Sequence, residues 1–565
     1  MNPPEAGRRH TCLLIADFNP ANLAARMRHD PAEPQVRVVE APMGQVVPAL
    51  CGGAGSGWEE DPDCCLVWAR PEAVSPAFAR LAGGEPVAAA RILAEVDAFA
   101  AGLGEAASRV RALFVASFAV PVHQRGYGVI DLSWPGGVGR ALLQMNLRLA
   151  EAAASSGNVW VLDAGRWMAA AGRGAFSPKL WHMARVPFAP AVFDEAVAEV
   201  KAGLDALDGR ARKVVVVDLD DTLWGGIVGE VGWEGLRLGG HDRIGEAHQE
   251  FQRALKALAR RGVLLTVASR NDEAVALEAM ERHPEMVLRP ADLAGWRIGW
   301  GDKALGIADL MGELNVGLEA AVFIDDSPFE RERVRAALPQ VLVPPWPADP
   351  ALFAPALLGL RCFDVLQVSA EDRARPEAYA SERQRRQLRQ EVPSLSAWLA
   401  SLGVQVRAEP LTPATAGRAA QLAGRTNQMT LGVRRPTQME LLAQGERPGT
   451  EVWIYGVSDR FGDSGLTGLA TLQVDGGDAR LADFAISCRV LGRGVEETVT
   501  HHLVGRACAL GAARLVATPA ATQRNRPCRE FLARALGAAV DGTHAWPVAG
   551  GFPLPAHVEL RACPP

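Results

Sequence analysis

The stretch KVVVVDLDDTLWGG, residues 213–226, decides the fold of the middle of the chain. Its four consecutive valines form the unbroken apolar run that is typical of a parallel strand buried on both faces. The run is followed by three acids and a hydroxyl: Asp218, Asp220, Asp221 and Thr222. Open α/β sheets bind ligands at the carboxyl ends of their strands, and charge this close to a core needs a purpose. We therefore favour a functional site here over an acidic turn that only caps a strand.

Carboxylates in this arrangement are suited to phosphoryl chemistry. Asp218 could attack phosphorus as a nucleophile, and Asp220 could handle the proton of the leaving group. Together the two carboxylates could hold Mg²⁺, which prefers oxygen ligands.

Three further segments follow in order: LLTVASRND (264–272), GWGDKALG (299–306) and AVFIDDSPFE (321–330). The first and third end apolar runs on Ser269 and on the pair Asp325 and Asp326, and the second contains Lys303. Together with DxDxT at 218–222, this order resembles the four motifs of the haloacid dehalogenase (HAD) superfamily of phosphohydrolases and phosphotransferases.

This resemblance implies a role for each matching residue. Asp218 would be the nucleophile that forms an aspartyl-phosphate, and Asp220 would be the general acid and base. The phosphate-binding residues would be Thr222, Ser269 and Lys303. The Mg²⁺ ligands would be Asp218, Asp220 through its backbone carbonyl, Asp325 and Asp326. A crowded acid cluster that faces a phosphate dianion needs both the lysine and the metal to be tolerable.

The spacing of the motifs predicts an open site. Between Thr222 and Ser269 lie 46 residues, and between Ser269 and Lys303 lie 33. Each gap is filled by a flap, a helix and a connection, which leaves little room for a cap domain. We expect a capless Rossmann-like HAD domain over residues 191–350, whose open site suits a substrate carried on, or passed to, a macromolecule.

Length and composition set broader limits. A chain of 565 residues with 48% hydrophobic and 22% charged residues is ordinary globular protein of three or four domains. The formal net charge of −6 gives no electrostatic case for nucleic acid, and no apolar run approaches the ~20 residues of a membrane span. The nine cysteines show no CxxC spacing of the kind that binds zinc. The N-terminus has only a very short apolar run, so we expect no export signal, mostly free thiols and a cytoplasmic protein.

Residues 1–190 alternate apolar runs with Ala-rich helical stretches, which predicts a parallel α/β sheet. The domain weakly resembles the SGNH hydrolases. That family needs a serine after its first strand, and here Asp17, Phe18 and Asn19 occupy the position. Asp163 and His182 could be remnants of its acid and base, but without a nucleophile a structural or docking role is the better interpretation.

Residues 351–395 are predicted to form a charged helical linker. Its charged stretch, residues 371–390, contains Arg373, Arg375, Arg383, Arg385, Arg386 and Arg389. A solvated connecting helix is the favoured interpretation. The alternative is a basic docking face for an acidic partner such as an acyl carrier protein.

Residues 396–565 contain RVLGRG (489–494) between a predicted strand and a predicted helix. Glycines there allow close backbone approach, and amides at a helix start can bind pyrophosphate. The order of elements resembles the GNAT acyltransferases, an α+β fold whose RxxGxG loop grips coenzyme A and could equally receive a carrier's phosphopantetheine arm. The implied pantetheine-binding residues are Arg489, Gly492, Arg493 and Gly494.

Cys488 directly precedes this loop. One interpretation is an acyl-enzyme nucleophile, with His501 or His502 on the next helix as its base. The other is an ordinary buried strand cysteine.

The combination of both domains resembles the FkbH-like proteins of polyketide biosynthesis. The matching segments are DLDDTLWGG (218–226), IDDSPFERE (324–332), TNQMTLGVRR (426–435), DRFGDSG (459–465) and SCRVLGRGVE (487–496). Asp221 and Ser327 lie where asparagine would be expected. The resemblance implies a glyceryltransferase/phosphatase that dephosphorylates D-1,3-bisphosphoglycerate and loads the glyceryl unit as a thioester on an acyl carrier protein. The alternatives are a Mg²⁺-dependent phosphatase for another small or carrier-bound substrate, and a non-catalytic assembly-line scaffold.

Overall fold

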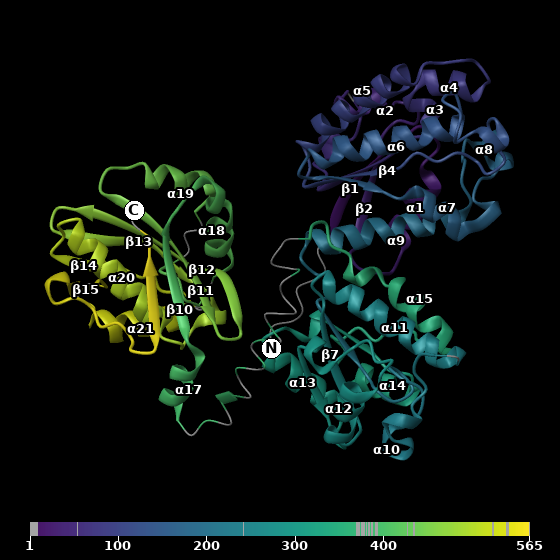
Figure 1. Cartoon of the computed structure of the whole chain (residues 1–565). Coiled ribbons are helices and arrows are strands. Elements are labelled where there is room, and N and C mark those ends of the chain that lie inside the picture. Colours follow the sequence, from purple (N-terminus) through teal and green to yellow (C-terminus); the bar gives the residue numbers. More distant parts are fainter. Residues whose placement is uncertain are drawn as a thin grey trace. The chain divides into compact units, whose positions relative to one another are not determined.

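The computed structural model describes residues 9–563 apart from positions 54, 241, 369–372, 374–378, 380, 382, 384, 386, 387, 390, 391, 393, 427, 433–435, 523, 524, 538, 540 and 541. Two compact units make up the chain, one of residues 1–287 with 297–373 and one of residues 288–296 with 374–565. The first unit contains two α/β domains, and the second contains a third domain (Figure 1). Within the described residues, no helix is long and apolar enough to cross a membrane.

A five-stranded parallel sheet of order β2-β1-β3-β4-β5 forms the core of the N-terminal domain. The strands are β1 (His10–Ala16), β2 (Val36–Glu40), β3 (Cys64–Trp68), β4 (Ala112–Ala116) and β5 (Val159–Leu162). The main helices are α1 (Ala21–His29), α2 (Val46–Leu50), α4 (Pro76–Ala82), α5 (Ala89–Ala107), α6 (Val138–Ala154), α7 (Ala164–Ala171), α8 (Pro178–Ala184) and α9 (Pro190–Leu207). One face of the sheet packs against α1, α7 and α9, and the other packs against α2, α4, α5 and α6.

The predicted parallel α/β sheet is confirmed here, with two differences. The edge strand β2 was not predicted, because it carries exposed charged residues that interrupt its apolar pattern. Helix α9 packs on the N-terminal sheet through Phe193, Val197 and Val200, so this core extends past the predicted boundary at residue 190. Periodicity reveals that a helix is amphipathic but not which sheet it covers.

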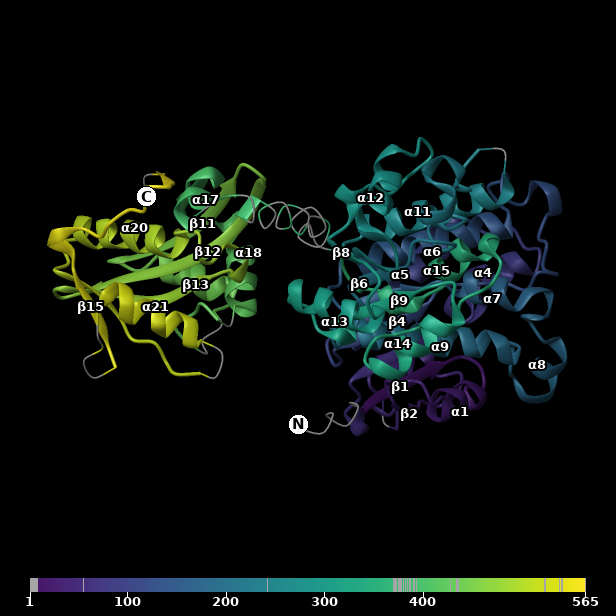
Figure 2. The same ribbon diagram turned by 90° about the horizontal axis from the view of Figure 1, so that it is seen from below.

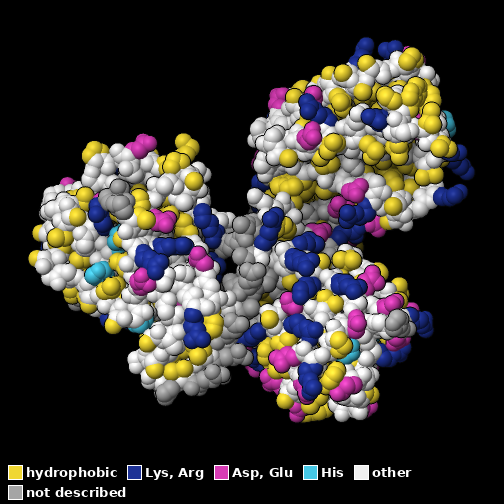
Figure 3. Space-filling view, viewed as in Figure 1, with side chains coloured by type: hydrophobic (Ala, Val, Ile, Leu, Met, Phe, Trp, Pro, Cys, Tyr) yellow, Lys and Arg dark blue, Asp and Glu magenta, His cyan; other side chains and the backbone are white. Residues whose placement is uncertain are grey.

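Hydrophobic side chains gather on the visible face of the N-terminal domain (Figure 3). On α6, Leu143 and Leu147 lie one turn apart and are 60% and 62% exposed. The loop before α6 exposes further large apolar residues: Val122, Val129, Ile130, Leu132 and Trp134.

The second domain of this unit is built on a four-stranded sheet of order β8-β7-β6-β9. The strands are β6 (Val214–Val217), β7 (Leu264–Ser269), β8 (Gly295–Ile298) and β9 (Ala321–Ile324). The helices are α10 (Val228–Val231), α11 (Arg243–Arg260), α12 (Glu273–Arg282), α13 (Lys303–Glu313), α14 (Pro328–Ala337) and α15 (Phe353–Leu358). The valine run is the central strand β6, fully buried and parallel to both β7 and β9, as its unbroken apolar pattern predicts.

The connections of this sheet are short. Between β6 and β7 the described residues form a flap with the one-turn helix α10, followed by α11. Between β7 and β8 lie α12 and a short 3₁₀ turn. Neither described connection contains an inserted cap domain, as the motif spacing predicts.

The domain continues beyond its predicted end at residue 350. Helix α15 follows a 3₁₀ turn and packs against α11 through the rings of Phe251 and Phe353, 5.7 Å apart. Of the predicted charged linker, Arg385 is buried rather than solvated, since it pairs with Asp459. Arg375 and Arg386 lie outside the described residues.

The second unit is an α+β domain with a seven-stranded sheet of order β15-β14-β13-β12-β11-β10-β16. Its strands are β10 (Val404–Pro410), β11 (Thr450–Asp459), β12 (Gly462–Asp475), β13 (Asp478–Ile486), β14 (Arg514–Ala517), β15 (His544–Pro547) and β16 (Val558–Ala562). The helices are α17 (Leu395–Leu402), α18 (Pro413–Arg425), α19 (Gln438–Gly445), α20 (Val495–Ala509) and α21 (Arg526–Leu536). Helices α17, α20 and α21 cover one face of the sheet, and α18 and α19 cover the other. Figure 2 shows α17, α18, α20 and α21 around the strands of this sheet.

The predicted order of strand, glycine loop, helix, strand and helix is present as β13, residues 487–494, α20, β14 and α21. The pairing of β13 with β14 is parallel, while β10 to β13 are antiparallel neighbours. The long strand β12 was missed, because it begins in the polar segment 459–465, which is rich in glycine and aspartate.

Candidate active site

The register of the central sheet brings three acids together. Val217 pairs with Ile324 across β6 and β9, so Asp218 and Asp325 leave adjacent parallel strands at the same level. The Asp218 amide donates to the Ile324 carbonyl at 3.0 Å. As a result, one carboxylate oxygen from each of Asp218, Asp325 and Asp326 lies within 4.8 Å of the others.

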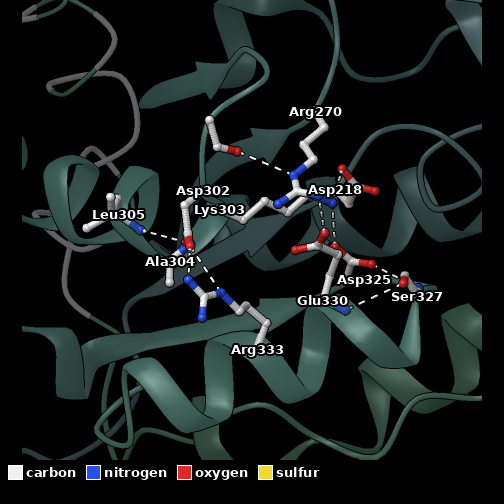
Figure 4. A network of polar contacts seen from close by, with 11 residues as sticks. Asp218, Arg270, Asp302, Lys303, Ala304, Leu305, Asp325, Ser327, Glu330 and Arg333 are labelled. Atoms are coloured by element: carbon white, nitrogen blue, oxygen red, sulfur yellow. Dashed lines mark hydrogen bonds and ion pairs between the residues drawn. The ribbon is translucent and has the colours of Figure 1, made fainter.

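Lys303 joins this cluster from the first turn of α13. Its Nζ lies 3.0 Å from Asp218 Oδ1 and 2.7 Å from Asp325 Oδ2. All three side chains are buried, and Figure 4 shows Lys303 extending toward the two carboxylates. Asp302 begins the helix by accepting the amide of Ala304 at 2.8 Å, which fixes the position of the lysine that follows.

Burial dominates the electrostatics of the site. It raises the pKa of Asp218 to about 6, with Lys303 opposing the rise and Asp325 adding to it. Burial also raises the pKa of Asp325 and of Asp326. Burial works to lower the pKa of Lys303, but its two carboxylate partners outweigh that effect and the pKa is raised. Three carboxylates share one cation here, and the excess negative charge fits a divalent metal with oxygen ligands.

We expect Mg²⁺ to stabilise the protein in a pH-dependent way. Without metal, the folded state holds protons on these acids that the unfolded state releases, so stability falls as pH rises from about 4 to above 6. For Asp218 alone, the shift from 3.8 to about 6 corresponds to ~3 kcal/mol. Thermal melts with Mg²⁺ or with a chelator should therefore differ by several degrees at pH 8 and by much less at pH 5, where protons compete with the metal. Equal effects at both pH values would contradict this assignment of the metal ligands.

The two predicted phosphate-binding hydroxyls differ in their surroundings. Ser269 ends β7 beside Asp218, and a hydrogen bond from its hydroxyl lowers the pKa of that carboxyl. Thr222 is fully buried, and its hydroxyl donates to Asp326 Oδ1 at 3.0 Å while accepting the Asp326 amide at 3.1 Å. These contacts show that Thr222 holds a metal-site acid in place, and its predicted phosphate-binding role stays a prediction.

Asp220 points away from the acid cluster into a set of donors. Its Oδ1 accepts the Trp224 indole N–H at 2.9 Å and the Val228 amide at 3.1 Å, and its Oδ2 accepts the Asn271 side-chain amide at 2.8 Å. Its carboxylate is therefore not among the oxygens that could hold the metal in the described residues. Burial raises its pKa, as a general acid near neutral pH requires.

Asn271 is a site residue that the sequence reasoning missed. The only sequence feature that could have identified Asn271 is its position two residues after Ser269. An Asn271→Ala variant should lower kcat by about 10- to 100-fold and shift the acidic limb of the pH–rate profile, since Asp220 loses a donor that positions it. Arg270→Ala is the matched control, because Arg270 is its neighbour and pairs with Glu330 at 3.1 Å instead. A profile that keeps its shape in Asn271→Ala would contradict the positioning role.

The two departures from the expected asparagines have local explanations. Asp221 has a φ of 53°, in the left-handed region that Asn and Asp tolerate, and accepts the Gly226 amide at 2.7 Å. Ser327 begins α14, where its hydroxyl faces the Glu330 amide at 3.5 Å.

The glycine loop of the C-terminal domain adopts a tight conformation. Gly492 and Gly494 have φ values of 75° and 80°, which favour glycine. A Cβ on Gly494 would lie 2.8 Å from the ring of His557, so this position also requires glycine for space. Cys488 lies in a 3₁₀ turn directly after β13, not at the end of the strand as predicted, and its side chain lies outside what the structure describes.

The predicted ligand-binding arginines are already engaged. Arg493 is buried, with its guanidinium 3.4 Å from Asp459 Oδ2 and donating to the Arg489 carbonyl at 2.7 Å. Its side chain therefore stabilises the loop from inside, and its predicted ligand-binding role stays a prediction. Arg489 is half-buried and donates to the Ser487 hydroxyl at 3.4 Å.

The two candidate histidines also have partners. His502 Nδ1 lies 3.0 Å from the Tyr455 hydroxyl, and both side chains are buried. Burial lowers the pKa of His502 to about 4, so its imidazole is neutral at pH 7. His501 Nδ1 contacts the Phe552 carbonyl. Each ring uses one nitrogen in these contacts.

One solved structure is similar to this chain over most of its own length. It is the N-terminal part of the protein BF1531 from Bacteroides fragilis, which contains a phosphatase domain and is complexed with Mg. The two are 24% identical, the TM-score is 0.59, and the match covers 64% of this chain and 95% of the other. They share a fold. The match is more than twice the length of residues 191–350, so the shared fold extends beyond the domain that contains the acid cluster. In this chain, the cluster of Asp218, Asp325 and Asp326 could hold a metal ion.

Acetyltransferase structures are also among the matches. The ribosomal-protein-S18-alanine N-acetyltransferase from Escherichia coli is 13% identical, covering 25% of this chain and 94% of the other at a TM-score of 0.20. YncA, an acetyltransferase from Salmonella typhimurium with acetyl-CoA, is 14% identical, covering 27% and 98% at a TM-score of 0.20. No family model and no curated protein sequence matches the chain.

The possible hydrolase remnants of the N-terminal domain do not form a triad. Asp17 accepts the Arg70 amide at 2.9 Å and pairs with its guanidinium at 2.8 Å. Asp163 begins α7, and His182 is exposed on α8. Among the described residues, no hydrogen bond or ion pair joins these two side chains. Arg70 also stacks 3.8 Å over the ring of Trp181. These contacts favour a structural role for this edge of the sheet.

Proposed function

We propose that the protein is a Mg²⁺-dependent phosphatase coupled to an acyltransferase, which takes D-1,3-bisphosphoglycerate and loads its glyceryl unit on an acyl carrier protein in polyketide biosynthesis. The observation that carries the phosphatase half is the buried cluster of Asp218, Lys303 and Asp325 at an uncapped sheet edge. Strongly perturbed acids around a lysine in such a place are typical of a catalytic site. Its open edge suits a carrier-bound substrate.

In the phosphatase half, Asp218 attacks the 3-phosphoryl group and forms an aspartyl-phosphate, while the bond from phosphorus to the C3 oxygen breaks. Asp220 gives its proton to the departing oxygen and then takes one from the water that releases phosphate. Lys303 and Ser269 contact the phosphoryl oxygens. When bound by Asp218, Asp325 and Asp326, Mg²⁺ supplies charge that offsets the repulsion between carboxylates and phosphate.

In the transfer half, the substrate's acyl phosphate is already activated. The Cys488 sulfur attacks the carbonyl carbon, the bond to the phosphate oxygen breaks, and inorganic phosphate leaves. The carrier's pantetheine thiol then attacks the glyceryl thioester, and Cys488 takes back the thiol proton. The sequence of the 487–496 segment and the glycine loop support this assignment.

Intact mass spectrometry tests the proposal. A phosphopantetheinylated carrier, 1,3-bisphosphoglycerate and Mg²⁺ are incubated with the wild-type protein, with Cys488→Ala or with Asp218→Asn. We expect wild type to add an unphosphorylated glyceryl mass to the carrier, Cys488→Ala to add none, and Asp218→Asn to add a phosphorylated one. Phosphate release without any acyl adduct, unaffected by Cys488→Ala, would reject the transfer half.

One observation favours a second candidate, a phosphatase whose C-terminal domain only binds. His502 is neutral, buried and bonded to Tyr455, and His501 is bonded to a backbone carbonyl. With a pKa lowered to about 4 by burial, His502 would be a weak base for a thiol. The same mass experiment separates the two candidates.

A further inference from the structure

The first turn of α20 places a carboxylate in the glycine loop. Glu496 Oε1 accepts the Gly492 amide at 2.9 Å, so the backbone donor that such a loop would offer to an anion is already used. Glu496 is 8% exposed, and its second oxygen, Oε2, is buried and has no hydrogen-bond partner among the described residues. An acceptor of this kind lies inside the loop where a phosphate oxygen would otherwise be bound.

Two cations near the loop are paired with a different acid. The buried Arg493 pairs with Asp459. The two carboxylate oxygens of Asp459 also accept hydrogen bonds from the Arg385 guanidinium, at 2.7 and 2.8 Å. Asp459 thus holds these cations behind the loop. A second acid, Glu497, follows Glu496 in the same helical turn. The anion-binding arrangement of a helix start is therefore opposed by its own first-turn carboxylates.

We propose that Glu496 is a specificity-determining residue that excludes ligands with a pyrophosphate group, coenzyme A above all, and leaves the loop to thiols on a singly charged phosphodiester arm. The inference rests on the proposed function in one respect, namely that a pantetheine thiol enters this domain. Coenzyme A brings a doubly charged pyrophosphate and a 3′-phosphate, whereas an arm linked to a serine brings one charge. Repulsion from a buried carboxylate grows with the charge of the ligand and is barely screened by salt.

The test is a binding titration on the full-length chain with two probes, coenzyme A and a phosphopantetheinyl-serine peptide. We expect Glu496→Ala to bind coenzyme A at least about tenfold more tightly than wild type, with a smaller gain for the peptide. Glu496→Gln keeps the size and removes the charge, so it should gain in the same direction and serves if the alanine variant melts early. Glu497→Gln is the matched control, because it removes the same charge from a residue that pairs with Arg534 at 3.6 Å and does not enter the loop.

Three outcomes would overturn the proposal. Wild type could bind coenzyme A as tightly as the Glu496 variants, Glu497→Gln could produce the same gain, or both probes could gain equally. Each would mean that Glu496 does not select against pyrophosphate. The titration needs neither phosphate release nor acyl transfer, so a failure of the proposed reaction leaves its result interpretable.

Discussion

Asp218→Asn should slow phosphate release by at least about 10³-fold, the scale on which loss of a covalent nucleophile acts. An amide cannot attack phosphorus, and Asp218 is the acid that the sheet register places beside both Lys303 and Asp325. Phosphate release under single-turnover conditions, with Mg²⁺ present, measures the effect. The aspartyl-phosphate that wild type forms, seen as a mass increase after acid quench, should be absent from the variant.

The same variant should fold normally. Asp218 is one of three buried carboxylates around one lysine, so removing its charge relieves repulsion while it also takes a partner from Lys303. At pH 8 without metal, its melting temperature should be no lower than that of wild type. Asp221→Asn is the matched control, since Asp221 is exposed and lies outside the cluster. Full phosphate release by Asp218→Asn, combined with its loss in Asp220→Asn, would transfer the nucleophile role to Asp220.

The sequence was most informative where buried strands end. A run of four valines predicts a central parallel strand, and the acids that follow two such strands must then meet at one edge. The strand argument places Asp218, Asp325 and Asp326 at the same edge of the sheet, but the motif resemblance was needed to bring them into one site, and the pairing of β6 with β9 puts them side by side. Lys303 needed the motif resemblance, since nothing in its own segment says that a helix start will aim it at the acids.

The sequence was least informative about side chains held by distant partners. Thr222 and Arg493 match motif positions. Their hydrogen-bond partners lie far away in the sequence: Asp326 is 104 residues from Thr222, and Asp459 is 34 residues from Arg493. Only the folded chain shows these two contacts. Glu496 is different, because its contact with the loop lies four residues away. An acidic residue in the first turn of a helix that directly follows a glycine loop can predict such a contact from the sequence alone.

Lys303→Met should have the second large effect, on stability as well as activity. Removing one member of a buried ion-pair cluster leaves the others unpaired, which costs about 3–5 kcal/mol. Here Asp218 and Asp325 would face each other and Asp326 without a cation. Phosphate release should fall by about 10²-fold or more, because the phosphoryl oxygens lose their protein cation.

The stability loss in Lys303→Met should depend on pH and metal. Loss of the lysine raises the pKa of Asp218 further above about 6, so the variant is least stable above that pH and regains stability as the acids take up protons at pH 5. Saturating Mg²⁺ should restore part of the loss at pH 8. Arg333→Met is the control, since Arg333 forms an exposed ion pair with Asp302 beside the same helix start, a type of pair that contributes under about 1 kcal/mol. Denaturant unfolding at pH 5 and pH 8 measures both variants. If Lys303→Met were no less stable than Arg333→Met at pH 8 without metal, the acids would have to be protonated or separated in the folded protein, and the charge cluster that supports the catalytic assignment would be wrong.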